Sequence, residues 1–246
     1  MIAQSVRDEL APSGKLRVGI NHGNAVLASR DAVSGELRGV AADLARELGR
    51  RCELPVELVA FESAGKMTAA LKADAWDVAF LAVEPGRAGE IAFTAPYLLI
   101  EGTYLIPPGS PIHSIADVDQ PGVRVGVSAG SAYELFLSRN LQNARILKSD
   151  TPHAAFDLLI DGKVDVVAGV RQALIANAAK LPGSRVFDER FMAIEQAMGM
   201  PHGRPAALNF LRGFIEDVKA GGFVTQALER AGIRGVAVAP PAAKLE

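Results

Sequence analysis

The order of apolar and polar positions along the chain predicts strands and helices in alternation. Val40, Leu44 and Leu48 recur at the spacing of one helix face, whereas residues 76–82 form an almost continuous apolar run. Such a run is typical of a strand that is buried on both faces of a parallel sheet. The first series of expected elements comprises strands at 16–20, 55–61 and 76–82 and helices at 40–50 and 63–72. This βαβαβ order predicts parallel strands with right-handed crossovers.

The same order is repeated further along the chain. Gly162 stands where a helix that begins at Pro152 should end, because glycine is common just past helix ends. The second series of expected elements comprises strands at 123–127, 144–147 and 164–168 and helices at 131–139, 152–162 and 172–180. Two such series in one chain predict two α/β lobes.

Two extended segments, 98–105 and 191–198, connect these series, and a long helix is expected at 205–220. If the chain crosses between the lobes in both segments, the second lobe is an insertion within the first. The predicted boundaries are 1–101 and 196–246 for lobe 1, 102–195 for lobe 2, and hinges near 100–106 and 191–198.

Composition narrows the class of protein. A chain of 246 residues with 49% hydrophobic and 22% charged residues has ample material for a globular core. The net charge of -2 and the absence of a long basic run argue against nucleic acid as a partner. The single cysteine, Cys52, permits no internal disulfide and no zinc site built on thiolates, and we expect it to be buried. The four histidines have no metal-ligand spacing, so we expect neither a metal nor a cofactor.

The chain as given carries no clear targeting segment. Its longest apolar stretch, 94–108, is interrupted by Pro96 and Glu101 and is too short to span a bilayer. Charged residues stand near the N-terminus where a secretory signal would be apolar. Two interpretations stay open: a cytoplasmic protein, or an exported protein whose leader was removed and replaced by Met1. The ending Lys244-Leu245-Glu246 is compatible with a vector origin.

Candidate binding residues follow from a rule of open α/β sheets, in which ligands bind where strands end and loops enter helices. That rule selects four loops. The candidates on them are Asn21, Asn24, Val83, Glu84, Arg87, Gly130, Ser131 and Arg171.

Arg87 is the sharpest of these candidates, because a guanidinium can hold a carboxylate by two parallel hydrogen bonds. The alternative is an ion pair with Glu84 or Glu90 that only closes the loop. Gly130 permits close backbone approach, and Ser131 can cap a helix whose first amides attract anions. The alternative there is an ordinary capped helix.

The other two loops are less decisive. Residues 21–24 form either a ligand-binding loop or a solvent turn, and Arg171 either reaches a cleft or starts a helix that faces water. The chain has no Gly-x-Ser-x-Gly motif, no phosphate-binding loop and no Gly-x-Gly-x-x-Gly motif. We therefore assign no catalytic residue.

The order of several motifs resembles the extracellular solute-binding proteins of ABC transporters, specifically the polar amino-acid-binding family (family 3). The resemblance covers about residues 15–232. The segments that carry it are Leu16-Arg-Val-Gly19, Gly35-Glu-Leu-Arg-Gly39 with Asp43 to Leu48, Trp76-Asp77-Val78 to Arg87, Ile91 to Tyr97, Val123 to Ser131, and Asp161-Gly-Lys-Val-Asp165.

This resemblance implies an α/β, two-lobed clamshell of the type II periplasmic-binding-protein class. Each lobe would be a mostly parallel sheet flanked by helices, and two hinge strands would join the lobes. It implies that the ligand sits between the lobes and that Arg87 grips its carboxylate, with Ser131 adding contacts. It also implies a periplasmic monomer whose closure is read, transiently, by a membrane permease.

The sequence departs from the family pattern at several positions. Val170 stands where many relatives have an aspartate for the ligand's amino group, and the family's aromatic positions align near Leu27 and Ala64. Two explanations stay open. Either the ligand is a carboxylate without an α-amino group, or Glu84, Glu62 or Asn21 accepts the ammonium from another direction.

Three functions compete at this point. The first is a receptor that binds a small carboxylate, an amino acid or related organic acid, without turnover. The second is a dehydratase-like periplasmic enzyme on the same scaffold, with Glu84 as the acid. The third is a sensory ligand-binding protein that signals through a partner chain.

Overall fold

The computed structural model describes residues 2–243, so the predicted vector-derived ending at 244–246 lies outside the described residues. The first βαβαβ series forms three parallel strands with β1 in the middle, and α2 and α3 provide the crossovers. The bounds of this series are β1 (Leu16–Asn21), α2 (Val40–Cys52), β4 (Val56–Phe61), α3 (Ala64–Ala69) and β5 (Val78–Ala82). All residues of β5 are buried, as its apolar run predicts.

The second series repeats this arrangement, with β7 between β8 and β9 and all three strands parallel. Its bounds are β7 (Arg124–Ser128), α5 (Ala132–Asn140), β8 (Arg145–Ser149), α6 (Pro152–Ile160), β9 (Val166–Val170) and α7 (Arg171–Ala178). The predicted α/β class, with two mostly parallel units flanked by helices, is therefore confirmed.

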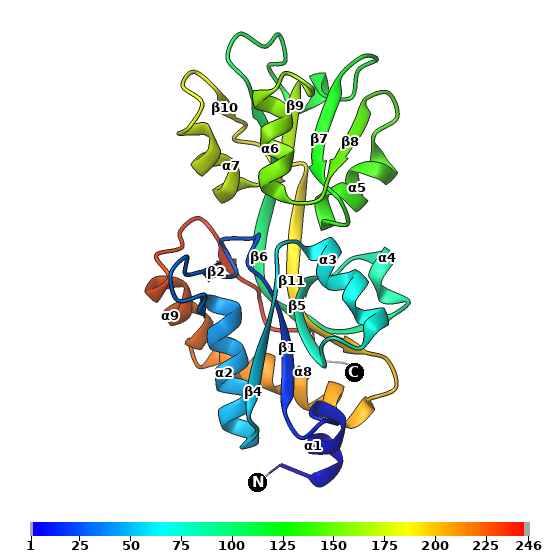
Figure 1. Cartoon of the computed structure of the whole chain (residues 1–246), viewed down its shortest axis with the longest axis vertical. Helices are drawn as coiled ribbons and strands as arrows, with labels where there is room; N and C mark the ends of the chain where they lie inside the picture. The colour runs from blue at the N-terminus through cyan, green and yellow to red at the C-terminus, as the bar shows by residue number, and fades with distance from the viewer. Residues whose placement is uncertain (1, 244–246) are drawn as a thin grey trace.

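Two long antiparallel strands, β6 (Ile91–Ile106) and β11 (Met192–Pro201), connect the series. The strand order is β4-β1-β5-β11-β6-β9-β7-β8, so β11 borders the first series and β6 borders the second. Figure 1 shows the first series below, the second above, and these two strands running side by side between them. The predicted boundaries at 101/102 and 195/196 fall inside β6 and β11, and they stay predictions.

The pairing of β6 with β11 shifts register around Gln196 and Ala197. Ala197 is paired with Pro96, which has no N–H to donate to the sheet. A bulge of this kind accommodates a proline inside a strand and re-aims the neighbouring side chains.

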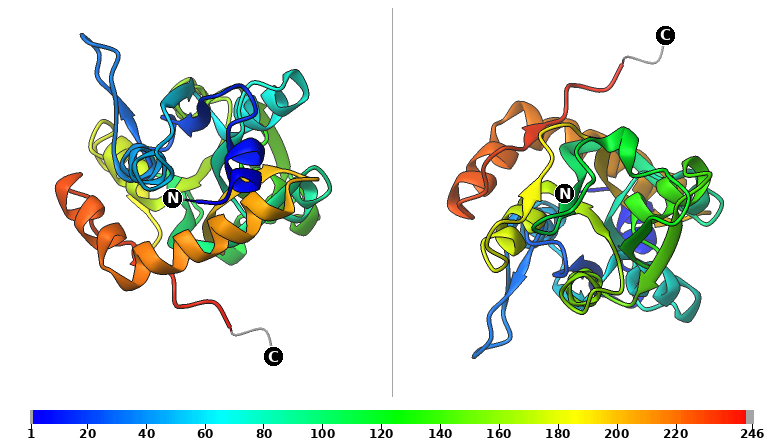
Figure 2. Two further views of the ribbon diagram at one scale, coloured as in Figure 1. Left: turned by 90° about the horizontal axis from the view of Figure 1, so that it is seen from below. Right: turned by 90° about the horizontal axis from the view of Figure 1, so that it is seen from above.

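The remaining elements surround this frame. They are α1 (Gln4–Leu10), β2 (Ser29–Arg30), β3 (Leu37–Arg38), η1 (Ala70–Ala73), α4 (Pro85–Ala88), η2 (Ile115–Asp117), β10 (Arg185–Val186), α8 (Pro205–Ala220), α9 (Phe223–Arg230) and β12 (Ala237–Val238). Figure 2 shows the β2–β3 hairpin projecting from the body and α8 and α9 lying along one side. Within residues 2–243, no helix has both the length and the apolar character needed to cross a membrane.

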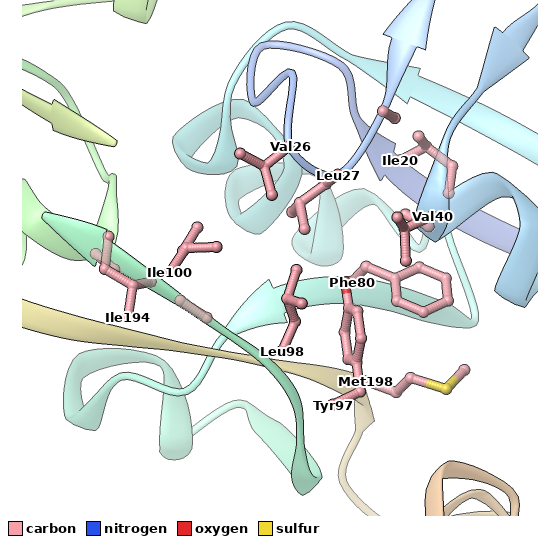
Figure 3. Close-up of a cluster of buried hydrophobic side chains, with 14 of the residues drawn as sticks. Ile20, Val26, Leu27, Val40, Phe80, Tyr97, Leu98, Ile100, Ile194 and Met198 are labelled. Carbon is pink, nitrogen blue, oxygen red and sulfur yellow. The ribbon is translucent and has the colours of Figure 1, made fainter. Parts of the chain in front are cut away.

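The core continues from the first series onto the connecting strands. In Figure 3, Phe80 of β5 faces Tyr97 of β6, and their rings meet edge to face with centroids 5.7 Å apart. Ile20 and Val40 from β1 and α2 belong to the same cluster. Cys52 is buried as predicted, and burial raises the pKa of its thiol to about 11.

Each series carries the same carboxylate–guanidinium pair just before its third strand. Asp77 accepts hydrogen bonds from the backbone N, Nε and Nη2 of Arg17 at 3.1, 3.0 and 2.8 Å. Asp165 accepts from the same three nitrogens of Arg124 at 2.7, 3.0 and 2.9 Å. The Asp77 side chain is 0% exposed and also pairs with Arg204, whereas the Asp165 side chain is 35% exposed.

These matched pairs predict unequal contributions to stability. Asp77→Ala strands two guanidinium groups beside a buried position and should lower the free energy of unfolding by about 3 kcal/mol. Asp165→Ala removes a half-exposed pair and should cost about 1 kcal/mol or less. Urea unfolding of both variants at neutral pH measures the difference. Equal losses would mean that burial does not set the strength of these pairs.

Candidate functional site

A cavity opens between the two series at the carboxyl ends of their strands. It encloses about 720 Å³ of space not filled by atoms, including the part that is open to solvent. Most of its wall is apolar, with side chains from both series and from β11. The polar residues that line it are Asn21, Asn24, Arg87, Ser128, Ser131, Tyr133, Asn177 and Gln196.

Arg87 is the central polar group of this wall. It lies in α4, directly after β5, and is only 2% exposed. Its Nη1 donates to the Ala82 carbonyl at 2.9 Å, and its Nη2 donates to the Gly130 carbonyl at 2.7 Å. Its buried Nε has no hydrogen-bond partner among the described residues. The guanidinium of this cavity-lining residue therefore joins the two series and keeps one N–H without a partner among the described residues.

Burial lowers the pKa of Arg87 to about 10, and the negative charge of Glu84 opposes that shift. The group is still protonated at neutral pH. A buried positive charge with an unsatisfied donor favours an anionic ligand.

Two further buried polar atoms on the cavity wall have no hydrogen-bond partner among the described residues: Oγ of Ser128 and Oε1 of Gln196. Ser128 ends β7, and Gln196 of β11 is paired with Ala82, whose carbonyl receives Arg87. The strand-end rule selects the loop 128–131, but Ser128 itself was not named as a candidate. The sequence prediction missed Gln196, which lies inside a connecting strand that carries no motif.

Ser131 and Gly130 occupy the positions expected of them. Ser131 caps α5, its Oγ accepting from the Glu134 amide at 3.1 Å, and it lines the cavity. Gly130 has a φ of +69° and donates its amide to the buried carboxylate of Glu134 at 3.0 Å. Close by, burial raises the pKa of the Tyr133 hydroxyl to about 12, although the Ser131 hydroxyl acts against that rise.

Asn21 and Asn24 both line the cavity, with their side-chain oxygens already used in the loop. Asn21 Oδ1 accepts from the Gly23 amide at 3.0 Å, and Asn24 Oδ1 accepts from the Val26 amide at 3.2 Å. The loop therefore contributes neutral amide side chains to the cavity wall and no charge.

Four candidates are not among the residues that line the cavity, namely Val83, Glu84, Gly130 and Arg171, and their part in ligand binding stays a prediction. Val83 is 38% exposed and is not part of the wall. Glu84 turns away because its Oε2 accepts from the Gly86 amide at 2.7 Å and its other oxygen pairs with Arg139. Arg171 donates hydrogen bonds to the Glu101 carboxylate and to the Phe187 carbonyl, each at 2.6 Å.

The residues at which the sequence departs from the pattern of the family that it resembles do line the cavity. Leu27, Ala64 and Val170 all line the cavity. Glu62, one of the alternative acceptors, instead pairs with Lys66 and lies outside the wall. In the described residues, no group of three or more His, Cys, Asp or Glu side chains is placed to hold a metal.

The two series approach closely at a pair of glycines. A Cβ atom on Gly65 would lie 2.3 Å from the Ala129 carbonyl oxygen, and one on Gly130 would lie 2.6 Å from the Gly65 Cα. Side chains at either position would therefore force the series apart.

Comparison with known protein families gives one match that covers most of the chain. The model of the bacterial extracellular solute-binding proteins, family 3, matches residues 16–231. Among curated proteins, the cyclohexadienyl dehydratase of Pseudomonas aeruginosa is 28% identical over 169 residues, which are 67% of this chain and 62% of that protein. The chain thus spans less than two thirds of the length of this curated relative.

Solved structures give the same fold. The solute receptor for L-cysteine of Neisseria gonorrhoeae matches with a TM-score of 0.80 and 23% identity, over 93% of each chain. An ancestral amino acid-binding protein, a precursor of cyclohexadienyl dehydratase, matches with a TM-score of 0.76 and 25% identity, over 91% of this chain and 97% of its own. A putative binding component of an ABC transporter from Wolinella succinogenes, complexed with lysine, gives 0.76 and 24%, over 89% and 95%.

The glycine contact predicts a selective effect on closure. Gly65→Ala is compatible with the helical backbone of α3 but collides with the Ala129 carbonyl, so it should open the cavity and raise the radius of gyration in X-ray scattering. Gly213→Ala in α8 is the control, since nothing lies within 4 Å of its Cβ position. It should leave the radius unchanged and stabilise the fold by about 1 kcal/mol. An unchanged radius for Gly65→Ala would contradict the contact.

Proposed function

The chain belongs to family 3 of the bacterial extracellular solute-binding proteins, and on that premise we propose that it captures a small carboxylate-bearing solute for an ABC importer. Family membership establishes a substrate-binding role. We propose the class of solute and the residues that hold it from the cavity and its buried arginine.

One observation carries this proposal: Arg87 lines the cavity, and its buried Nε has no hydrogen-bond partner among the described residues. A guanidinium has five N–H donors, and two of those of Arg87 are given to the Ala82 and Gly130 carbonyls. Leaving a buried charged donor unsatisfied costs about 1–3 kcal/mol or more. A carboxylate satisfies it with a charge-assisted bond and neutralises the positive charge.

Ligand binding is coupled to closure in this proposal. Arg87 and Glu84 belong to the first series, and their partners, Gly130 and Arg139, belong to the second. We propose that the series act as two lobes, 1–101 with 196–246 and 102–195, hinged near 100–106 and 191–198. A ligand that neutralises Arg87 would then favour the closed arrangement, in which both contacts form.

The remaining features follow from the family. Its members are periplasmic or extracellular receptors. We propose a periplasmic monomer whose closed form docks transiently on a membrane permease, with Asn21, Asn24 and Ser131 assisting Arg87 on the cavity wall and Gly130 holding the guanidinium through its carbonyl.

A dehydratase is the second candidate, because a curated relative at 28% identity is a cyclohexadienyl dehydratase. Elimination of water needs a group that donates a proton to the leaving hydroxyl. The predicted acid, Glu84, caps α4 and pairs with Arg139 outside the cavity. Within residues 2–243, the cavity wall includes no aspartate or glutamate, which favours the receptor.

The role of Arg87 predicts a loss of binding. Arg87→Met should weaken any carboxylate that binds the wild type by about 100-fold, since a charge-assisted pair contributes about 3 kcal/mol. Isothermal titration at neutral pH measures this, with hits found by thermal shift in a panel of carboxylates. Arg145→Met, at an exposed position in β8, is the control and should bind as the wild type does. Unaltered affinity in Arg87→Met would refute the proposed role.

The two candidate functions separate in a turnover assay. Loss of water from a hydroxylated cyclohexadiene leaves an aromatic ring, so a dehydratase would raise the ultraviolet absorbance of such a substrate. We expect no change over hours at micromolar protein. Turnover that disappears in Glu84→Gln while the fold persists would replace the receptor by the enzyme.

A further inference from the structure

We infer that the cavity accepts monocarboxylates with an apolar body and no cationic group, and that it excludes zwitterionic amino acids. This inference rests on the proposed function, because it concerns the ligand that Arg87 would hold. It goes beyond that function by naming the chemical class of the solute.

The charge of the wall favours a carboxylate over a zwitterion. Among the described residues that line the cavity, Arg87 alone carries a formal charge. A carboxylate balances that charge, but an α-ammonium group one carbon away has no negative partner and is repelled by the guanidinium. Taking an ammonium out of water without a counter-charge costs several kcal/mol, by order of magnitude.

Nearby carboxylates already form ion pairs and hydrogen bonds within the protein. Glu84 pairs with Arg139, and Glu62 pairs with Lys66. Glu134 is buried under Gly130 and accepts from the Gly130 amide, the Ser138 hydroxyl and Lys148. Moving any of these carboxylates toward a ligand would break these ion pairs and hydrogen bonds.

Much of the remaining wall is apolar. Val170, the last residue of β9, lines the cavity and is 8% exposed, and Ala168, Leu174 and Ile194 line it as well. Ser128 and Gln196 are neutral, and their unpartnered Oγ and Oε1 atoms can bond a hydroxyl on the ligand. A neutral acceptor satisfies a hydroxyl fully, but it does not compensate the charge of an ammonium.

The experiment compares ligands that share a skeleton and differ at the α-carbon. 4-Methylpentanoate, 2-hydroxy-4-methylpentanoate and leucine form one set, and 3-phenylpropanoate, 2-hydroxy-3-phenylpropanoate and phenylalanine form another. Isothermal titration at neutral pH should show that, in each skeleton that binds, the acids without nitrogen bind at least tenfold more tightly than the amino acid. Equal or tighter binding of the amino acid, with Arg87→Met still deficient, would overturn the inference and leave the proposed function standing. No binding of either class, including other chain lengths, would overturn both.

A gain-of-function variant tests the cause of the preference. Val170 is the N-cap of α7 and makes no side-chain capping bond, so both aspartate and asparagine suit the position. Val170→Asp adds a negative charge to the wall and should improve leucine binding at least tenfold while weakening 4-methylpentanoate. Val170→Asn, which adds no charge, should leave the preference of the wild type. An identical response in the two variants would contradict the electrostatic basis of the inference.

Discussion

The structure depends most on one buried charge, the guanidinium of Arg87, held between carbonyl oxygens of two separate chain segments. Ala82 ends a strand of the first series, and Gly130 precedes Ser131, the N-cap of α5, in the second. Neither carbonyl carries a full charge, so the pair fixes the guanidinium in place without neutralising it. That combination, rigid placement with uncompensated charge, is what makes an arginine a receptor for an anion rather than a structural ion pair. The same bond joins the two series, and for this reason we propose that closure of the cavity responds to what occupies it.

Each series has an ion pair of its own that fixes its strands relative to one another. The Asp77–Arg17 and Asp165–Arg124 pairs sit at equivalent points, where a third parallel strand enters each sheet. Each ties the first strand of its series to the third, with no group from the other series. β6 and β11 run between the two series, and their pairing shifts register at Gln196. The irregular part of the sheet thus lies in the strands for which we propose the hinges.

Much of this architecture can be predicted from the sequence, because period-2 and period-3.6 patterns are local. The parallel strands and α8 match their predicted positions, and the strand-end rule selects Arg87, Ser131, Asn21 and Asn24, all of which line the cavity. The direction of a long charged side chain cannot be predicted from these local patterns. Glu84 and Arg171 stand at strand ends too, but partners distant in sequence, Arg139 and Glu101, draw them away. Short elements such as α1 and α4 were missed because too few residues show a period.

The charged and polar groups of the cavity wall determine which ligands, and which chemistry, this scaffold can support. A relative that binds amino acids must balance two opposite charges, and a dehydratase must place a proton donor near its substrate. Here the wall balances one charge and offers neutral amides and hydroxyls for the rest. Changing Val170 alone introduces the missing negative charge at a helix N-terminus, where an ionised carboxylate is stabilised by the free amides. A single position on the wall would then decide whether this scaffold takes a zwitterion or a simple acid, while Arg87 serves both.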